Sequence, residues 1–247
     1  MAPVASAYHR RVEANTQAIV RLAWSRLLGL PDDTLDPAAN PVRVVRSDTA
    51  DDAMVVRLWD TWVVRGPGWF HDRTADADPA ALVDPGTLLR TCAGHPARLV
   101  GHAVLGFTDR YAEPSVPGSV ALEDVPVDDA PAAAAALERA CPPDDVREVG
   151  LAEMGRLFVT LDDRDQPTSG AGYDEWQGLL GHLGVLTPPE LRGSGWGTVA
   201  AALALNDALD VGLVAQWRAR TDNAASRRVA RRLGFAAAGE QSTVTLG

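Results

Sequence analysis

The sequence of 247 residues contains no lysine, so its 23 basic residues are all arginine. The phosphate loop of nucleoside-triphosphate enzymes needs a Gly-Lys pair followed by Ser or Thr, and that class of site is therefore excluded. The 33 acidic residues outnumber the basic ones and give a formal net charge of -10 at pH 7. An acidic surface repels phosphate backbones, so we expect no nucleic-acid partner.

Cysteines are few, and long apolar runs are absent. The two cysteines, Cys92 and Cys141, lie far apart in the sequence, so we expect neither a disulfide framework nor a bound metal. No segment approaches the ~18 to 20 apolar residues of a membrane helix, and residues 1–11 lack the basic-then-apolar pattern of a signal peptide. We therefore expect a cytoplasmic protein with no membrane partner.

The overall amino-acid composition is typical of a globular protein. Hydrophobic residues make up 46% and charged residues 23%, and the length of 247 residues suits one large domain or two modest ones. Pro114, Pro117, Gly118 and Pro126 lie among acidic residues and mark the best candidate linker. We place a boundary near residue 115, with domains at 1–115 and 116–247.

The first half is predicted to be of α+β character. Apolar residues recur at helical spacing over 7–29, and Pro31 follows them. Runs rich in Val and Trp predict short strands at 42–45, 54–58 and 62–64, followed by the breakers Gly66, Pro67 and Gly68. A helix at 79–91 and a strand at 98–107 complete this half.

The second half is predicted to have a mixed sheet with the order β-β-β-α-β-α-β after one helix. The expected elements are a helix at 130–140, strands at 156–161, 169–176 and 182–186, a helix at 195–210, a strand at 213–217, a helix at 223–233 and a strand at 242–246. The whole chain is therefore expected to be an α/β protein.

The most informative segment joins the strand at 182–186 to the helix that follows it. A Pro-Pro loop leads into Arg192-Gly193-Ser194-Gly195-Trp196-Gly197, which opens the helix. Glycines let backbone N–H groups converge, and a helix N-terminus adds partial positive charge. The segment predicts a site for an anion, most naturally a diphosphate. A dinucleotide fingerprint fits poorly, because Thr198 stands where a third small residue is needed.

The loop matches the R-x-x-G-x-G pattern and resembles the GCN5-related N-acetyltransferase (GNAT) superfamily. A second segment, in which Asn223-Ala224-Ala225-Ser226 begins a helix that ends in Leu233-Gly234-Phe235, is similar to another conserved segment of that superfamily. The resemblance covers roughly half of the chain. It implies a GNAT-like domain at 116–247 that uses acetyl-CoA as acyl donor.

The resemblance also implies which residues hold acetyl-CoA. Its diphosphate would lie on the amides of 192–197 and Thr198, and its pantetheine arm would pair with the edge of the strand at 182–186, at Val185 and Leu186. A backbone N–H near Leu186 would stabilise the negative charge on the thioester oxygen during direct attack by the amine. Asn223 and Ser226 are expected to contact the pantetheine arm. Asn223 also reads as a helix N-cap.

Candidates for proton transfer come from the strands that flank the acyl site. His182 is the first candidate for general base, with Glu175 and Asp174 next; each also reads as an ordinary surface or core residue. The tyrosine that many relatives use to protonate the leaving thiolate corresponds to Ala230. Ser226, Tyr173 or a water would have to replace it.

We therefore expect an N-acetyltransferase that acts on the primary amine of a small molecule. Because of Ala230, the alternative is an acetyl-CoA-binding sensor or interaction protein with little or no turnover. Residues 1–115 are expected to help shape the acceptor pocket, and a diverged copy of the same fold is a further interpretation of them. The sequence is compatible with a homodimer.

Overall fold

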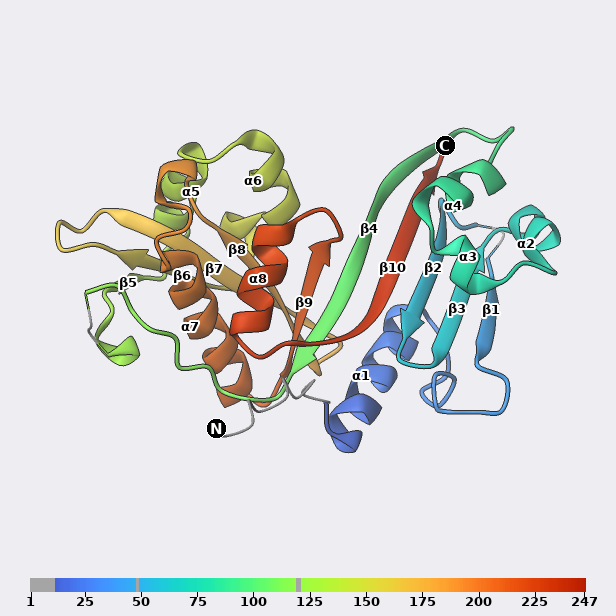
Figure 1. Cartoon of the computed structure of the whole chain (residues 1–247), viewed down its shortest axis with the longest axis horizontal. Coiled ribbons are helices and arrows are strands. Elements are labelled where there is room, and N and C mark those ends of the chain that lie inside the picture. The colour runs from blue at the N-terminus through green and yellow to red at the C-terminus, as the bar shows by residue number, and fades with distance from the viewer. Residues whose placement is uncertain (1–11, 48, 119–120) are drawn as a thin grey trace, which may run out of the picture.

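The computed structural model describes residues 12–47, 49–118 and 121–247. Within them, ten strands form one sheet in the order β1-β3-β2-β10-β4-β9-β8-β7-β6-β5 (Figure 1). The strands are β1 Val42–Arg46, β2 Asp52–Leu58, β3 Thr61–Gly66, β4 Ala97–Thr108, β5 Val127–Asp128, β6 Arg156–Leu161, β7 Pro167–Trp176, β8 Leu180–Leu186, β9 Val214–Arg220 and β10 Ala236–Leu246.

Eight α-helices are present in the same described residues. They are α1 Ala14–Leu27, α2 Gly68–Thr74, α3 Pro79–Leu82, α4 Pro85–Thr91, α5 Pro131–Arg139, α6 Pro143–Val149, α7 Trp196–Asp210 and α8 Ala224–Arg232. Short 3₁₀ turns lie at Leu122–Asp124, Leu151–Glu153 and Pro189–Leu191. No helix in the described part of the chain is long and apolar enough to cross a membrane.

The sheet joins the two halves of the sequence. β4 pairs antiparallel with β9, and β10 lies between β4 and β2, so the last strand of the chain is flanked by two strands of the first half. In Figure 1 the long strands β4 and β10 run side by side through the middle of the molecule. The separation into domains at 1–115 and 116–247 stays a prediction.

The predicted mixed α/β class is confirmed, and the order of elements from β6 to β10 is the predicted one. β8 and β9 are parallel, and their pairing covers only the four positions from Leu180↔Val214 to Leu183↔Trp217. Beyond these positions β8 pairs only with β7, and β9 pairs only with β4. The strands therefore separate at 184–186, where the sequence places the acyl site.

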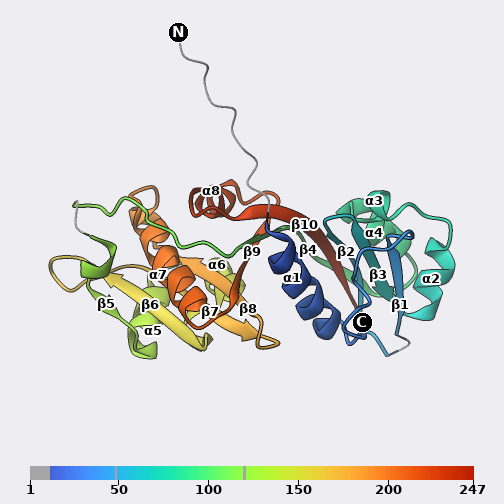
Figure 2. The same ribbon diagram turned by 90° about the horizontal axis from the view of Figure 1, so that it is seen from below.

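Alternating residues of the strands face helices on opposite sides of the sheet. Ala215 and Trp217 of β9 belong to the core beneath α7, whereas Val214 belongs to the core that includes Val20 and Trp24 of α1. Figure 2 shows α1 alongside β9 and β4 near the middle of the molecule, apart from α2, α3 and α4 at the β1 end of the sheet. The first helix of the chain thus packs beside strands of the second half.

Several element predictions need correction. The helix expected at 79–91 is two short helices, because Asp84 caps a new helix at Pro85 and its side chain accepts from the amide of Thr87. No helix is predicted from the sequence at α2 or α6; each begins just after a proline, which suits a first helical turn. The helix expected at 7–29 runs from Ala14 to Leu27, and its predicted start lies outside the described residues.

Candidate active site

A cavity of about 1120 Å³ opens where β8 and β9 separate. Its wall is built by β8 with Asp174 of β7, the loop before α7, the helices α6 and α8 and the second part of β9, and by β4 and β10 on the far side. Nine predicted acetyl-CoA residues line it: Val185, Leu186, Arg192, Gly193, Gly195, Gly197, Thr198, Asn223 and Ser226. Residues that lie up to 41 positions apart in the sequence are therefore brought to one surface.

The glycine loop presents unused backbone donors to this cavity. Gly193 and Gly195 have φ values of 83° and 103°, in the left-handed region that favours glycine. Within the described residues, no hydrogen bond is formed by the amides of four residues, namely Gly193, Gly195, Trp196 and Gly197. The first turn of α7 thus has free N–H groups and a positive dipole end, which is the physical requirement for binding phosphate.

Close packing fixes the start of α7 against the end of β8. A Cβ atom on Gly197 would lie 2.7 Å from Oγ1 of Thr187. That hydroxyl is itself held by Ser169 Oγ at 2.8 Å, and Ser169 also donates to the Leu186 carbonyl at 2.9 Å. The glycine is therefore required by the close approach of the helix to the strand.

The Arg192 side chain holds the loop through two contacts. Its Nε donates to the Thr187 carbonyl at 3.1 Å, and its Nη2 lies 2.6 Å from the carboxylate of Asp145 on α6. The arginine of the R-x-x-G-x-G pattern thus ties the loop to both a strand end and a helix.

The second motif is built around the start of α8. Asn223 caps this helix, since its Oδ1 accepts from the Ser226 amide at 3.0 Å. The Ser226 hydroxyl in turn accepts from Trp217 Nε1 at 3.0 Å. Both residues also line the cavity.

Two residues of the predicted acetyl-CoA site do not line the cavity. The side chain of Trp196 packs with the core cluster of Val116, Val125 and Val199, which favours a structural role for the side chain, whereas its backbone amide stays among the free N–H groups at the start of α7 in the described part of the chain. Ser194 donates to the Leu191 carbonyl at 2.5 Å and stabilises the turn.

The candidates for proton transfer separate into two groups. His182 and Asp174 are register partners on β8 and β7, and both line the cavity. Tyr173 does not line it: its hydroxyl donates to Asp207 at 2.6 Å, and burial raises its pKa to about 12. The exposed Glu175 is likewise absent from the cavity wall. Of these four residues, the structure brings only His182 and Asp174 to the candidate site.

His182 is held by neighbours that sequence reasoning missed. Its ring stacks on Trp176 with centroids 4.0 Å apart, and Gln216 Nε2 lies 2.9 Å from its Nδ1. Burial, with a smaller effect of the positive charge of Arg218, lowers the pKa of His182 to about 4. His182 is therefore neutral at physiological pH. The contact with Gln216 has no sequence signal, because it depends on the register of β8 against β9.

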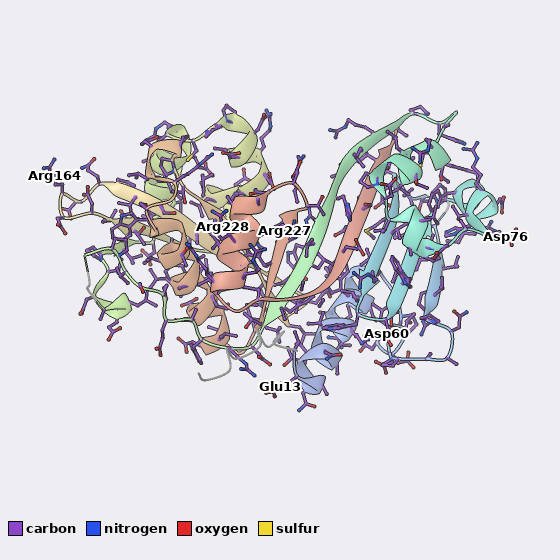
Figure 3. All side chains as sticks on the ribbon, viewed as in Figure 1. Glu13, Asp60, Asp76, Arg164, Arg227 and Arg228 are labelled. Atoms are coloured by element: carbon purple, nitrogen blue, oxygen red, sulfur yellow. The ribbon has the colours of Figure 1, made fainter. Side chains whose placement is uncertain are left out.

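Arginines without an ion pair face the cavity beside the loop. Figure 3 shows Arg228, labelled with Arg227, on α8 in the centre of the molecule. Arg228, Arg232 and Arg218 line the cavity and form no ion pair among residues 12–47, 49–118 and 121–247. Arg227 instead donates to the Thr221 carbonyl at 2.9 Å. The cavity thus offers positive charge for an anionic ligand in a protein whose net charge is negative.

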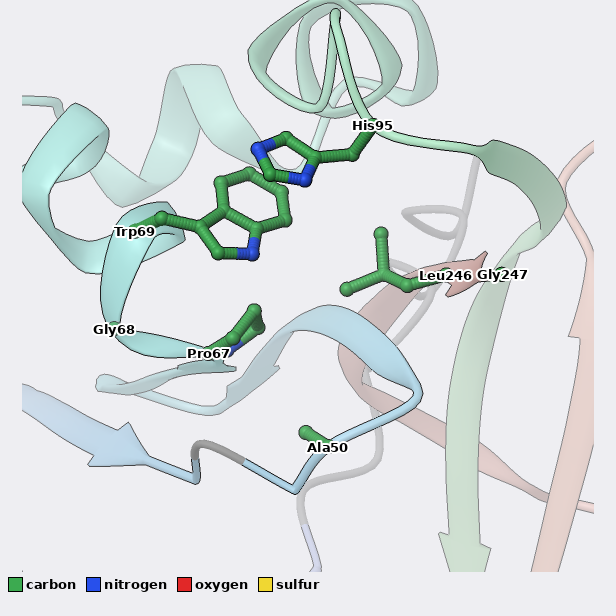
Figure 4. A pocket seen from close by; sticks show the side chains of 7 residues that line it. All are labelled: Ala50, Pro67, Gly68, Trp69, His95, Leu246 and Gly247. Atoms are coloured by element: carbon green, nitrogen blue, oxygen red, sulfur yellow. The ribbon is translucent and has the colours of Figure 1, made fainter.

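A smaller cavity of about 270 Å³ lies at the other end of the sheet (Figure 4). There Trp69 and His95 stack with ring centroids 3.6 Å apart, beside Pro67 and Leu246. None of the predicted site residues lines it, so it is not the candidate site.

Comparison with known proteins bears on this site. Residues 121–235, which contain the glycine loop and the start of α8, match the model of the Acetyltransferase (GNAT) family. This part of the chain belongs to the GNAT family. The predicted enzyme class, an acyl-CoA-dependent N-acyltransferase of GNAT type, is thereby confirmed.

Solved structures give distant similarities. A putative GNAT-family acetyltransferase from Novosphingobium aromaticivorans is 17% identical over 93% of this chain and 99% of its own, with a TM-score of 0.47. A GCN5-related N-acetyltransferase-like protein from Streptococcus suis is 15% identical over 95% and 99%, with a TM-score of 0.42. A GCN5-related N-acetyltransferase from Kribbella flavida is 22% identical over 64% and 63%, with a TM-score of 0.44. A search of curated proteins finds no significant match.

Proposed function

We propose that this GNAT protein transfers the acetyl group of acetyl-CoA to the primary amine of a small molecule. The observation that carries the proposal is the row of unused N–H donors at the start of α7, at one end of a cavity that continues along the unpaired edge of β8. A diphosphate fits the donors, and an amide-containing arm fits a strand edge.

Different residues along the cavity would bind different parts of acetyl-CoA. Gly193, Gly195 and Gly197 would hold the diphosphate, with Arg228 and Arg232 supplying positive charge nearby. The edge of β8 at Val185 and Leu186 would orient the thioester, which supplies the activated acyl group. Direct attack by the neutral amine on the thioester carbonyl would form the C–N bond, break the C–S bond and expel the CoA thiolate. The proton that the nitrogen loses would reach that thiolate through solvent, so the products are the amide and the free CoA thiol.

The positions and pKa values of the two cysteines argue against a covalent acyl-enzyme intermediate on either thiol. Neither Cys92 nor Cys141 lines the cavity, and burial raises the pKa of both thiols, that of Cys141 to about 11. A thiol is a nucleophile only when deprotonated, so neither is suited to accept the acyl group.

The acceptor would enter from the side of β4 and β10. Arg98, Val100, His102, Gln241 and Thr243 line this part of the cavity and come from outside the segment that matches the family. Asp174 supplies a carboxylate to an incoming ammonium group. We therefore propose that the first part of the chain and the last strand shape the acceptor pocket.

A matched pair of glycine variants tests the diphosphate site. Gly193 and Gly212 have φ values of 83° and 86°, and an added Cβ would meet no atom within 4 Å at either position. Each Ala variant should cost a similar ~1 kcal/mol of stability from backbone strain. Only Gly193→Ala should weaken CoA binding, by about tenfold or more, in a calorimetric titration. Equal binding by both variants would remove the loop from the proposal.

Turnover separates the enzyme from the alternative of a sensor. Release of the CoA thiol is followed with acetyl-CoA and a panel of amines, with propionyl-CoA in a parallel series. Thiol release that depends on an amine and is faster with acetyl-CoA is the expected result. CoA binding without thiol release would support the sensor instead, and faster reaction with propionyl-CoA would contradict the acetyl specificity.

A further inference from the structure

A buried chain of side chains connects α1 to His182. Trp24 Nε1 donates to Gln216 Oε1 at 2.9 Å, and Gln216 Nε2 lies 2.9 Å from His182 Nδ1. Gln216 is fully buried and Trp24 is 4% exposed, so water does not compete with the contact between them. Trp24 precedes the segment that matches the family. The first part of the molecule therefore supplies one member of this row of hydrogen-bonded side chains.

The chemistry of these groups fixes where the proton of the imidazole resides. The indole N–H is only a donor, so the atom of Gln216 that faces it must be the carbonyl oxygen. The amide NH₂ then faces His182 and is itself only a donor, so Nδ1 must accept. A neutral imidazole with an accepting Nδ1 carries its proton on Nε2. A cationic ring would place a second donor against the amide, which opposes protonation.

The Nε2–H group is directed to the site. His182 lines the cavity, and Nε2 forms no hydrogen bond within the described residues. Nε2 is not fully buried, because no unpaired atom of His182 is enclosed by protein. The charged groups beside it are Asp174 on β7 and Arg218 on β9, and Arg218 is free of ion pairs in the described structure.

We propose that His182 is a hydrogen-bond donor to the acyl acceptor, and that with Arg218 it binds a carboxylate of an amine that carries one. Trp24 and Gln216 are positioning residues that hold His182 in the Nε2–H form. Asp174, opposite His182, is placed to receive the ammonium group of the same molecule. The inference rests on the proposed function and narrows its substrate class to amino acids and related amines. It gives His182 a role other than that of the predicted general base.

The tautomer is tested directly by ¹H–¹⁵N NMR of imidazole-labelled protein, with His182→Gln to assign the signal. The expected spectrum shows a proton on Nε2 and no titration between pH 5.5 and 8. In Gln216→Glu, a carboxylate accepts from both Trp24 and the ring, so the proton should move to Nδ1 and the pKa of His182 should rise. Trp24→Phe is the milder variant if Gln216→Glu fails to fold; it should yield both tautomers because the amide is free to rotate. A proton on Nδ1 in the parent protein would overturn the proposal.

The substrate class is tested with matched amines. The panel contains amino acids, their α-carboxamides, glucosamine and spermidine, each with acetyl-CoA. At least one amino acid should have a kcat/KM about tenfold or more above its carboxamide, mainly through KM, because a hydrogen bond to a charged group is lost in the amide. Arg218→Gln and His182→Gln should each reduce this preference and leave CoA affinity unchanged.

The two proposals fail in different ways. Turnover of glucosamine or spermidine with no preference for any carboxylate overturns this inference and leaves the acetyltransferase in place. CoA binding without turnover of any amine overturns this inference and supports the sensor. Loss of CoA binding from the parent protein overturns both.

Discussion

Gly197→Ala is the substitution that most sharply separates loop geometry from general stability. The added methyl group would lie 2.7 Å from Thr187 Oγ1, about 0.7 Å closer than ordinary contact begins. Thr187 cannot rotate away freely, because its side chain is β-branched and its hydroxyl is paired with Ser169 at 2.8 Å. The first turn of α7 must therefore shift, and the free amides of Trp196 and Gly197 shift with it.

The expected effects on stability and binding differ in size. Overpacking costs ~1 to 3 kcal/mol, whereas replacing glycine by alanine in a helix contributes up to ~1 kcal/mol in the other direction. The melting temperature should therefore fall only slightly. CoA affinity, measured by calorimetric titration, should fall by about tenfold or more, because several N–H donors are displaced together.

A second substitution supplies the control. Thr187→Ala removes the atom that the new methyl group would meet, and Ser169 keeps its bond to the Leu186 carbonyl. The double variant should therefore recover most of the lost affinity, with a coupling energy of ~1 kcal/mol or more in the double-mutant cycle. Undiminished CoA binding by Gly197→Ala, or additive losses in the double variant, would refute this account of the loop.

Three further predictions concern other parts of the molecule. Tyr173→Phe should leave kcat/KM for acyl transfer unchanged, because the hydroxyl contacts Asp207 away from the cavity; a large loss of activity would contradict this placement. Because the pKa of His182 falls from its usual 6.5 to about 4, its contribution to stability is present above pH ~6.5 and is lost as pH falls towards 4, by up to ~3 kcal/mol. Urea unfolding at a series of pH values should show this loss in the parent and not in His182→Gln. Asn223→Ala should lower stability by ~1 kcal/mol through the lost N-cap, as measured by thermal melting, and Ala224→Gly at exposed N1 is a matched control for general helix effects.

The sequence was sufficient for the local parts of the site. Glycines at 193, 195 and 197 between a strand and a helix are typical of an anion-binding loop, and the structure gives each a physical reason: two positive φ values and one close contact. The Asn223 cap follows from the preference of that side chain for helix starts. These are short-range effects, in which the atoms that matter lie within a few residues of one another.

The long-range pairings were not predictable in the same way. Nothing in the local pattern of 236–246 shows that β10 inserts between β2 and β4, because alternation of polar and apolar residues does not name a partner strand. The contact of Trp24 with Gln216 spans 192 positions and has no local signature. The position of His182 on a strand is visible in the sequence, but its protonation is set by neighbours from two other elements, Gln216 of β9 and Trp24 of α1.

A crystal structure with CoA bound tests the central claim most directly. The account predicts diphosphate oxygens at ~3 Å from the free amides of the loop, those of Gly193, Gly195, Trp196 and Gly197, with the sulfur near the point where β8 and β9 separate. A diphosphate bound elsewhere in the cavity, with those amides facing only water, would contradict it.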